Sequence, residues 1–276
     1  LILNAHIDTV PINPGFTSDP FRLIRRERRL FGLGSADTKG AIAAILEALA
    51  ARQRAGRPPR NLAVLFSGDE ELGGASIRQF LASERTRGLA RAIVCEPTGC
   101  RVGTRHRGVY AATVGARSPG GHSSLADRVP NPLAALSRAA AALDQMGTRH
   151  HDLGPAGLKG LCMNLAALDG GVAFNIIPSL ATLTFSMRPA PGVDMAALAE
   201  EARACVHEAT APLDTEWNVI ATNPAFATRA VASFQPLLGD LVSGPLDLPF
   251  GTEAGQFVEE GIDTVVLEPG RIEQAH

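Results

Sequence analysis

Two adjacent glutamates, Glu70 and Glu71, follow a short apolar run at residues 62–66 that is typical of a buried parallel strand. In open α/β sheets, ligands bind beyond the carboxyl ends of the strands, which is where these carboxylates would lie. Neighbouring side chains on an extended backbone point to opposite sides, so one carboxylate could bind a metal ion while the other faces a bound water. Taken alone, the pair could equally be two solvated acids in a loop.

Further imidazole and carboxylate side chains occur just after predicted strands or at loop-to-helix turns: His6, Asp8, Asp37, Glu96 and His276. Each of them alone is more often a structural or solvated residue. Several of them at one edge of one sheet predict a metal centre. Imidazole and carboxylate without thiolate suit zinc, cobalt or manganese.

Two divalent ions would be neutralised by three coordinating carboxylates and one hydroxide, which makes burial of the centre electrostatically feasible. Such a pair of ions could polarise a carbonyl and lower the pKa of a bound water. The remaining glutamate could then act as general base for that water and as general acid for a leaving amine.

A sheet is needed to bring these side chains together. Short apolar runs predict strands at residues 1–5, 62–66, 92–95 and 264–267, and breaker-free segments predict helices at 41–51, 75–82 and 234–242. This order predicts an α/β fold with a mostly parallel sheet and helices on both faces, built from residues 1–104 and 223–276. Residues 21–24 and 29–31 predict a small hairpin.

The pattern changes after Gly103. Alternating segments predict strands at 109–116, 161–168, 177–188 and 216–221, and Ala-rich segments predict helices at 132–146 and 195–209. This arrangement is typical of an α+β domain with an antiparallel sheet and two helices on one face. We therefore expect residues 105–222 to form a second domain, inserted into the first.

The composition favours a small-molecule partner. The chain has 276 residues, 45% of them hydrophobic and 20% charged, and a formal net charge of −2. This balance gives no reason to expect binding to nucleic acid or to an anionic membrane. Four cysteines without a CxxC pair fit a reducing compartment, so a cytoplasmic location is expected. Because the chain opens at Leu1 inside an apparent strand, we expect it to be a fragment.

Short motifs that contain the candidate residues follow one another along nearly the whole chain. They are His6-x-Asp8, Gly34-x-x-Asp37-x-Lys39-Gly40, Asp69-Glu70-Glu71, Glu96-Pro97-Thr98, Gly120-Gly121-His122-Ser123-Ser124, Asn175-Ile176-Ile177-Pro178, Gly251-Thr252-Glu253-Ala254 and Glu268-Pro269-Gly270-x-Ile272-x-Gln274-Ala275-His276. This ordered set resembles the M20 metallopeptidase family. The last two motifs are most similar to those of acetylornithine and acetylcitrulline deacetylases.

The resemblance implies two divalent metal ions, zinc in the first place, with cobalt or manganese as alternatives. It implies that Asp37 bridges the two ions, with His6 and Glu96 on one of them and Glu71 and His276 on the other. In the same scheme Glu70 is the general base. Asp8 accepts a hydrogen bond from the His6 ring and fixes its tautomer.

The inserted domain of the family is a lid or dimerisation domain, so the resemblance also implies a homodimer. His122 would polarise the scissile carbonyl or stabilise the oxyanion, and otherwise is a loop histidine without a role. Asn175 and Arg188 would hold the substrate carboxylate, although Arg188 could equally be a surface charge. Thr252 would contact the substrate backbone. His106 matches no motif and is interpreted as a packing or surface residue.

The resemblance implies hydrolysis of the amide bond of an N-acyl amino acid, in the first place N-acetylornithine or N-acetylcitrulline. A succinyl-diaminopimelate desuccinylase, an aminoacylase and a dipeptidase are the alternatives within the family. An inactive amino-acid-binding protein on the same scaffold is the alternative from another class. The family also has a closing helix after the last ligand, and its absence would leave His276 on a frayed end.

Overall fold

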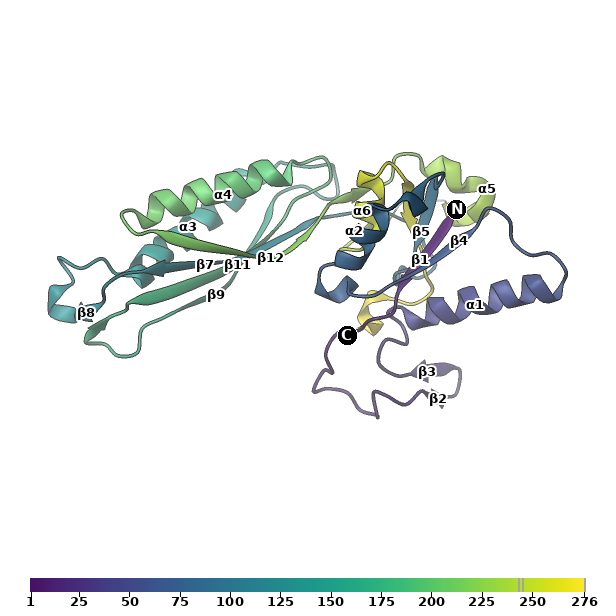
Figure 1. Ribbon diagram of the computed structural model, residues 1–276, viewed down its shortest axis with the longest axis horizontal. Helices are drawn as coiled ribbons and strands as arrows, with labels where there is room; N and C mark the ends of the chain where they lie inside the picture. Colours follow the sequence, from purple (N-terminus) through teal and green to yellow (C-terminus); the bar gives the residue numbers. More distant parts are fainter. Residues whose placement is uncertain (243, 245, 276) are drawn as a thin grey trace. The chain divides into compact units, whose positions relative to one another are not determined.

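The computed structural model describes residues 1–242, 244 and 246–275 of the chain. The chain forms two compact units, drawn in Figure 1. Unit 1 comprises Leu1–His106 and Phe226–His276, and unit 2 comprises Arg107–Ala225. From the sequence, we placed these two divisions at 104/105 and 222/223.

Unit 1 contains a seven-stranded sheet whose central strands are parallel. The order is β13 (Phe226–Ala227), β6 (Gly103–His106), β15 (Asp263–Val266), β5 (Arg91–Val94), β1 (Ile2–His6) and β4 (Ala63–Ser67), and β14 (Leu246–Leu248) pairs with β6. Strands β4, β1, β5 and β15 run parallel to one another, whereas β13 and β15 pair with β6 in the antiparallel sense. The predicted α/β class is thus confirmed.

Helices cover both faces of this sheet, because successive strand residues point to opposite sides. Helices α2 (Ala75–Leu81) and α6 (Ala254–Glu259) pack on the face that carries Ile2 and Val94. Helix α1 (Lys39–Arg54) packs against Ala5 and Cys95 on the opposite face. Phe234 packs there as well, on Ile93 of β5.

The strand register places the predicted ligands at one edge. His6 at the end of β1 is paired with Ser67 at the end of β4, and Asn4 of β1 is paired with Val94 at the end of β5. The residues that follow β4 and β5 therefore leave the sheet beside His6. Because these strands are parallel, all of their carboxyl ends lie on the same side.

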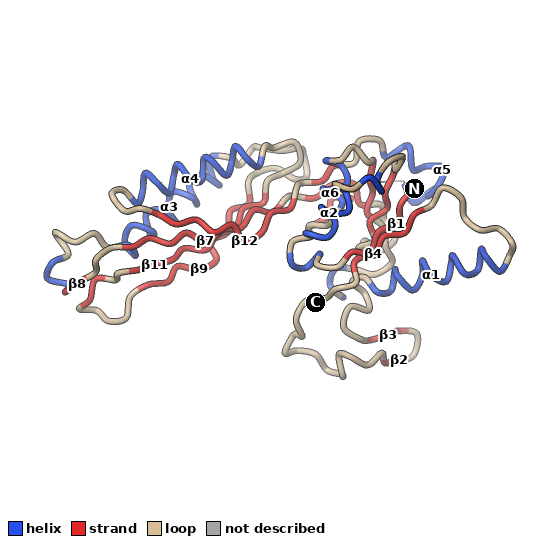
Figure 2. The backbone as a smooth tube through the Cα atoms, viewed as in Figure 1, coloured by secondary structure: helices blue, strands red, loops and turns tan. Residues whose placement is uncertain are grey.

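Unit 2 has a four-stranded antiparallel sheet with one covered face. Its order is β12 (Thr215–Asn223), β7 (Val109–Arg117), β11 (Leu180–Arg188) and β9 (Cys162–Gly170). Burial alternates strictly along β7 and β11. Helices α3 (Pro132–Arg149) and α4 (Met195–Thr210) lie side by side over the buried face, as Figure 2 shows. A short pair, β8 (Gly121–His122) and β10 (Ile176–Ile177), adjoins this sheet.

Two predicted elements differ from the structure. The hairpin consists of β2 (Ile24–Arg26) and β3 (Arg29–Phe31), so its first strand starts later than predicted, and Glu27 at its turn has a positive φ of 54°. In place of one helix at 234–242, the chain forms α5 (Gln235–Leu238) between the 3-10 turns η4 (Val231–Phe234) and η5 (Gly239–Val242). Gly239 also has a positive φ, which ends the α-helix.

Four further 3-10 turns complete the set of helical segments: η1 (Glu70–Leu72), η2 (Glu84–Thr86), η3 (Ser123–Leu125) and η6 (Ile272–Gln274). The sequence did not predict β6, β13 or β14, because these strands are only two to four residues long and are defined by their tertiary pairing. Within the described residues, the helices lack the combination of length and apolar character needed to cross a lipid bilayer.

Candidate metal centre

The imidazole of His6 lies among carboxylates that come from three other segments of unit 1. Its Nε2 atom is 2.8 Å from Oδ1 of Asp37, which precedes α1, and 3.8 Å from Oε1 of Glu96, which follows β5. Glu70 and Glu71 join the cluster from the η1 turn after β4. His6, Asp37 and Glu96 are 2%, 8% and 5% exposed, so the centre is largely shielded from water.

Potential ligand atoms form two groups that share His6. One consists of His6, Asp37 and Glu71, the other of His6, Glu70 and Glu96, and within each group the atoms lie within 4.8 Å of one another. These distances suit coordination of divalent cations by imidazole and carboxylate. The predicted ligand His276 lies outside the described residues. The grouping differs from the predicted one, because Glu70, the predicted general base, falls among possible ligands.

The electrostatics of the cluster also fit a cation. Burial, followed by the charges of Glu70 and Asp37, raises the pKa of Glu96 well above its ordinary value. Burial is also the largest cause that raises the pKa of Glu70, to about 8. For His6, burial lowers the pKa, but the hydrogen bond with Asp37 and the nearby acids outweigh it and raise the pKa to about 9. Crowded acids that resist ionisation are stabilised as carboxylates by a bound metal ion.

Asp8 holds the segment that carries both glutamates. Its two carboxylate oxygens accept hydrogen bonds from the backbone N–H groups of Glu70 and Glu71, at 3.2 and 3.1 Å. Nδ1 of His6 lies 3.0 Å from the backbone carbonyl oxygen of Asp8 and 3.3 Å from its carboxylate. A proton on Nδ1 leaves Nε2 as the ligand atom. Asp8 therefore contacts the ring mainly through its backbone carbonyl oxygen, whereas the prediction named its carboxylate, and it also fixes the η1 turn.

Asp69 gives this turn its shape. Its φ of 96° lies in the left-handed region, and its carboxylate accepts hydrogen bonds from the backbone N–H groups of Ala75 and Ser76 at the start of α2. Together with Asp8, these contacts fix the backbone on both sides of the two glutamates. The pair is thus held by hydrogen bonds and is not a solvated loop.

A buried polar network beneath the centre was not predicted from the sequence. Nδ2 of Asn4 donates to Oγ of Ser67 at 3.2 Å, and Ser67 donates to Oε2 of Glu253 at 2.6 Å. All three residues are at most 2% exposed. Burial raises the pKa of Glu253, although hydrogen bonds from Ser67 and Asn4 oppose this. The available signal was the polar residues Asn4 and Ser67 in the mainly apolar strands β1 and β4.

Thr252 and His106 form a second buried contact. Thr252 is fully buried, its N–H donates to Nε2 of His106 at 3.2 Å, and its Oγ1 lies 3.0 Å from the same nitrogen. Thr252 Oγ1 also accepts the N–H of Ala254 at 3.0 Å. Thr252 is thus buried within the protein, and its predicted contact with the substrate backbone stays a prediction. His106 is a packing residue that orients the turn before α6.

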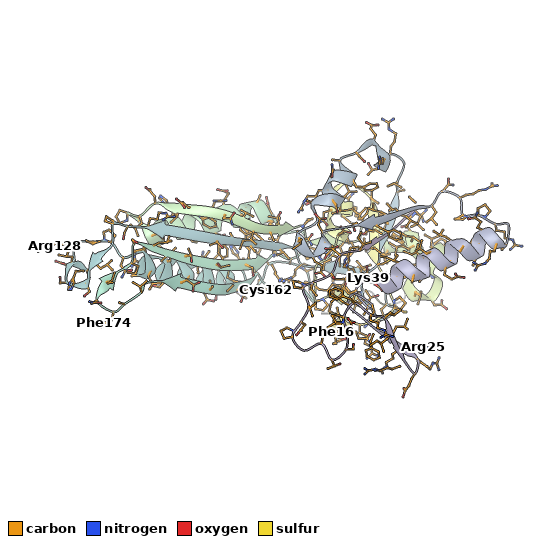
Figure 3. All side chains as sticks on the ribbon, turned by 60° about the horizontal axis from the view of Figure 1, so that its bottom comes forward. Phe16, Arg25, Lys39, Arg128, Cys162 and Phe174 are labelled. Atoms are coloured by element: carbon orange, nitrogen blue, oxygen red, sulfur yellow. The ribbon has the colours of Figure 1, made fainter. Side chains whose placement is uncertain are left out.

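The remaining predicted residues belong to unit 2. His122 and Asn175 are exposed and close together, because β8 and β10 pair and the N–H of Ser123 donates to the carbonyl oxygen of Asn175. Arg188 lies at the opposite end of β11, paired with Cys162, and Figure 3 labels Cys162 and Phe174 at these two ends of the unit. At ~3.3 Å per residue, β11 spans roughly 26 Å. Within one chain, Asn175 and Arg188 therefore do not hold the same carboxylate.

Comparison with known proteins gives a consistent family. The model of peptidase family M20/M25/M40 matches residues 2–276. An N-acetyl-L-citrulline deacetylase of Xanthomonas campestris is 32% identical over 287 residues, which cover 100% of this chain and 75% of that protein. An acetylornithine deacetylase of Proteus mirabilis is 32% identical over 293 residues, which cover 100% of this chain and 73% of that protein.

Solved structures show the same fold. An M20 family metallo-carboxypeptidase of Sulfolobus solfataricus has a TM-score of 0.74 at 17% identity, and the match covers 96% of this chain and 76% of that one. YXEP of Bacillus subtilis, described as a dinuclear metal binding peptidase, has a TM-score of 0.68 at 15% identity over 98% of this chain and 71% of that one. The chain described here belongs to the M20/M25/M40 peptidase family and is a metallohydrolase.

Proposed function

We propose that this protein hydrolyses the amide bond of N-acyl amino acids with the help of two divalent metal ions. The observation that carries the proposal is the convergence of His6 with acids from separate segments, at the carboxyl edge of the sheet. His6, Asp37, Glu71 and Glu96 would hold the ions, together with His276. Bound there, divalent ions would polarise the amide carbonyl and make a water molecule more acidic.

Glu70 is the proposed general base. It takes a proton from the attacking water and delivers it to the leaving amine nitrogen. Asp8 supports this role, because it binds the backbone N–H of Glu70 and limits the positions of its carboxylate. The alternative role for Glu70 is a metal ligand beside His6 and Glu96. Metal content distinguishes the two roles, since a base can be removed without loss of metal and a ligand cannot.

The names of the relatives support the substrate. The citrulline and ornithine deacetylases described above, each 32% identical to this chain, are named for acetylated amino acids. We therefore propose N-acetylornithine or N-acetylcitrulline as the substrate. Relatives at this identity can act on different substrates with the same metal centre, so the acyl group and the amino acid need to be varied separately.

The test is a Glu70→Ala variant, assayed for release of free amine from N-acetylornithine, N-acetylcitrulline and other N-acyl amino acids. General base catalysis typically contributes about 10²–10⁴-fold, so we expect at least a hundredfold loss of kcat with the metal content unchanged near two per chain. Glu47→Ala removes an exposed carboxylate of α1 and is the matched control. Full activity in Glu70→Ala would overturn the mechanism, and loss of metal would assign Glu70 as a ligand.

A further inference from the structure

A cleft of about 200 Å³ opens beside the metal centre, and its described walls all belong to unit 1. The loop after β1 (residues 9–16), the turn at 32–36 and residues 274–275 line it. Figure 3 labels Phe16 on the first of these loops. Asp37 and Glu71 also line the cleft, and both belong to one of the two possible ligand groups. A substituent of the reacting carbonyl that points to this side of the metal centre therefore enters the cleft.

The side chains that line the cleft indicate an uncharged occupant. Apolar residues Val10, Phe16 and Leu33 form much of the wall, and the charged residues among the described lining are Asp37 and Glu71. Lys39 lies nearby, but its Nζ atom donates to the backbone carbonyl oxygen of Leu33 at 3.3 Å. A carboxylate bound between Val10, Phe16 and Leu33, away from the metal ions, would lose water without gaining a cation, which is costly. The amino-acid part of the substrate, with its carboxylate, is therefore poorly suited to this side.

The size of the cleft exceeds what an acetyl group needs. Its volume of about 200 Å³ is below the range for sites that hold a whole drug-sized ligand, roughly 300–1,000 Å³, and suits one part of a substrate. One water molecule takes about 30 Å³ in the liquid, and the methyl group of an acetyl is of similar size. Gly34 keeps the turn close to the first loop, because a Cβ atom there would be 2.6 Å from Cγ2 of Thr9. The wall is therefore compact, while the space inside remains open.

We propose that this cleft receives the acyl group of the substrate, and that it accepts uncharged acyl chains longer than acetyl and disfavours succinyl. This inference rests on the proposed amide hydrolysis and adds the class of acyl group. It also separates this protein from a desuccinylase, whose substrate would bring a second carboxylate into a cleft that has no cation among its described lining residues.

The first experiment measures kcat/KM of the metal-loaded enzyme for ornithine carrying N-acetyl, N-propionyl, N-butyryl and N-succinyl groups. We expect the propionyl and butyryl substrates to be cleaved at least as well as the acetyl one, and the succinyl one at least tenfold more slowly. Val10→Trp should fill the cleft and lower the butyryl-to-acetyl ratio of kcat/KM by roughly tenfold or more, the typical effect of one badly placed methylene group. Phe16→Ala should raise the same ratio.

Leu46→Trp is the matched control, because it adds the same bulk to an exposed position of α1 and should leave the ratio unchanged. An unchanged ratio in both Val10→Trp and Phe16→Ala, or preference for succinyl, would overturn the inference.

A second measurement does not depend on turnover. Calorimetric titration of metal-loaded Glu70→Gln with the same compounds should show tighter binding of butyryl than of acetyl, and Val10→Trp in that background should abolish the difference. If the wild-type enzyme cleaves none of these substrates, the proposed function fails, and the titration still decides whether the cleft binds acyl groups. Binding that is independent of chain length and of Val10 would refute the cleft assignment even in an active enzyme.

Discussion

The two units differ most in what they bury. Unit 1 buries His6, Asp37, Glu96, Glu253 and Glu268, with the three glutamates at most 5% exposed. The buried core of unit 2 is apolar, and among its described residues Thr210 is the buried polar side chain. Burying a charge costs free energy unless it is paired or binds a metal ion. The contrast indicates that the buried acids of the metal centre lower the stability of unit 1, whereas the apolar core of unit 2 stabilises that unit.

The largest predicted effect on stability concerns the core of unit 2. Phe185 is fully buried beneath α3 and α4, and its ring lies 5.8 Å from that of Trp217 in an edge-on arrangement. Phe185→Ala should lower the free energy of unfolding by about 3–5 kcal/mol, through the loss of buried apolar surface and the cavity left behind. Urea unfolding followed by Trp217 fluorescence measures this, because Trp217 is the single tryptophan of the chain and belongs to unit 2.

Leu180→Ala on the same strand is the control for Phe185→Ala. Leu180 is 40% exposed, so its truncation should cost less than about 1 kcal/mol. If the two variants unfolded at the same urea concentration, the apolar core would not be what stabilises unit 2. The comparison of the two units would then lose its physical basis.

The same contrast explains which parts of the protein were predictable from sequence. The alternation along β7 and β11 and the Ala-rich composition of α3 are local signals, and they predicted the right elements. The apolar runs of β1 and β4 likewise placed Glu70 and Glu71 at a strand end. The short strand β6 has the sequence Gly-Thr-Arg-His and forms because of its neighbours in the sheet. Its residues show no apolar alternation from which a strand could be predicted.

At the site, residue types and motif order identified His6, Asp37 and Glu96 as neighbours, because parallel strands end at one edge. The Asn4–Ser67–Glu253 network depends on contacts between residues up to 186 positions apart, which one sequence does not reveal. The sequence analysis also did not consider the length of the strand that lies between two candidate residues. The length of β11 separates Asn175 from Arg188, although the sequence analysis assigned both to one substrate carboxylate.

A second prediction concerns the pH dependence of the metal-free protein. Burial is the largest cause that raises the pKa of Glu70 and of Glu268 from 4.5 to about 8. The pKa of His6 is raised from 6.5 to about 9, since its hydrogen bond with Asp37 and nearby acids outweigh burial. Each group binds its proton more tightly in the folded protein than in the unfolded chain. The stability they contribute is therefore fully present below the unfolded pKa and is lost as the pH rises through 8 to 9.

Chelator-treated protein should thus become steadily less stable between pH 5 and pH 9, as measured by urea unfolding with far-UV circular dichroism. Restored metal should reverse the trend, because ligands bind metal in their deprotonated forms. At a free metal concentration of a hundred times Kd, the gain is about 2.7 kcal/mol. A metal-free protein whose stability rises with pH would show that the acids of unit 1 are not crowded in the way the structure places them.

The smallest predicted effect lies on the surface of unit 2, where Glu201 of α4 accepts hydrogen bonds from Arg149 at 2.9 Å and pairs with His150 at 2.6 Å. Burial acts to raise the pKa of Glu201, but these partners outweigh it and lower the pKa. The resulting stability is present above the ordinary pKa of a glutamate and is lost as the pH falls through the lowered value. Water screens this cluster, so Glu201→Gln should lower Tm at pH 7 by no more than about two degrees.

This small shift should vanish at acid pH below the lowered pKa of Glu201, where Glu201 is protonated in the wild-type protein as well. Glu200→Gln, on the neighbouring and more exposed position of α4, provides the control, because the carboxylate of Glu200 lies 3.7 Å from Arg203 in a loose pair. A decrease in Tm for Glu201→Gln as large as that for Phe185→Ala would mean that unit 2 also depends on charge for its stability. The two units would then differ in where their acids lie, inside unit 1 and at the surface of unit 2, and no longer in what holds each of them folded.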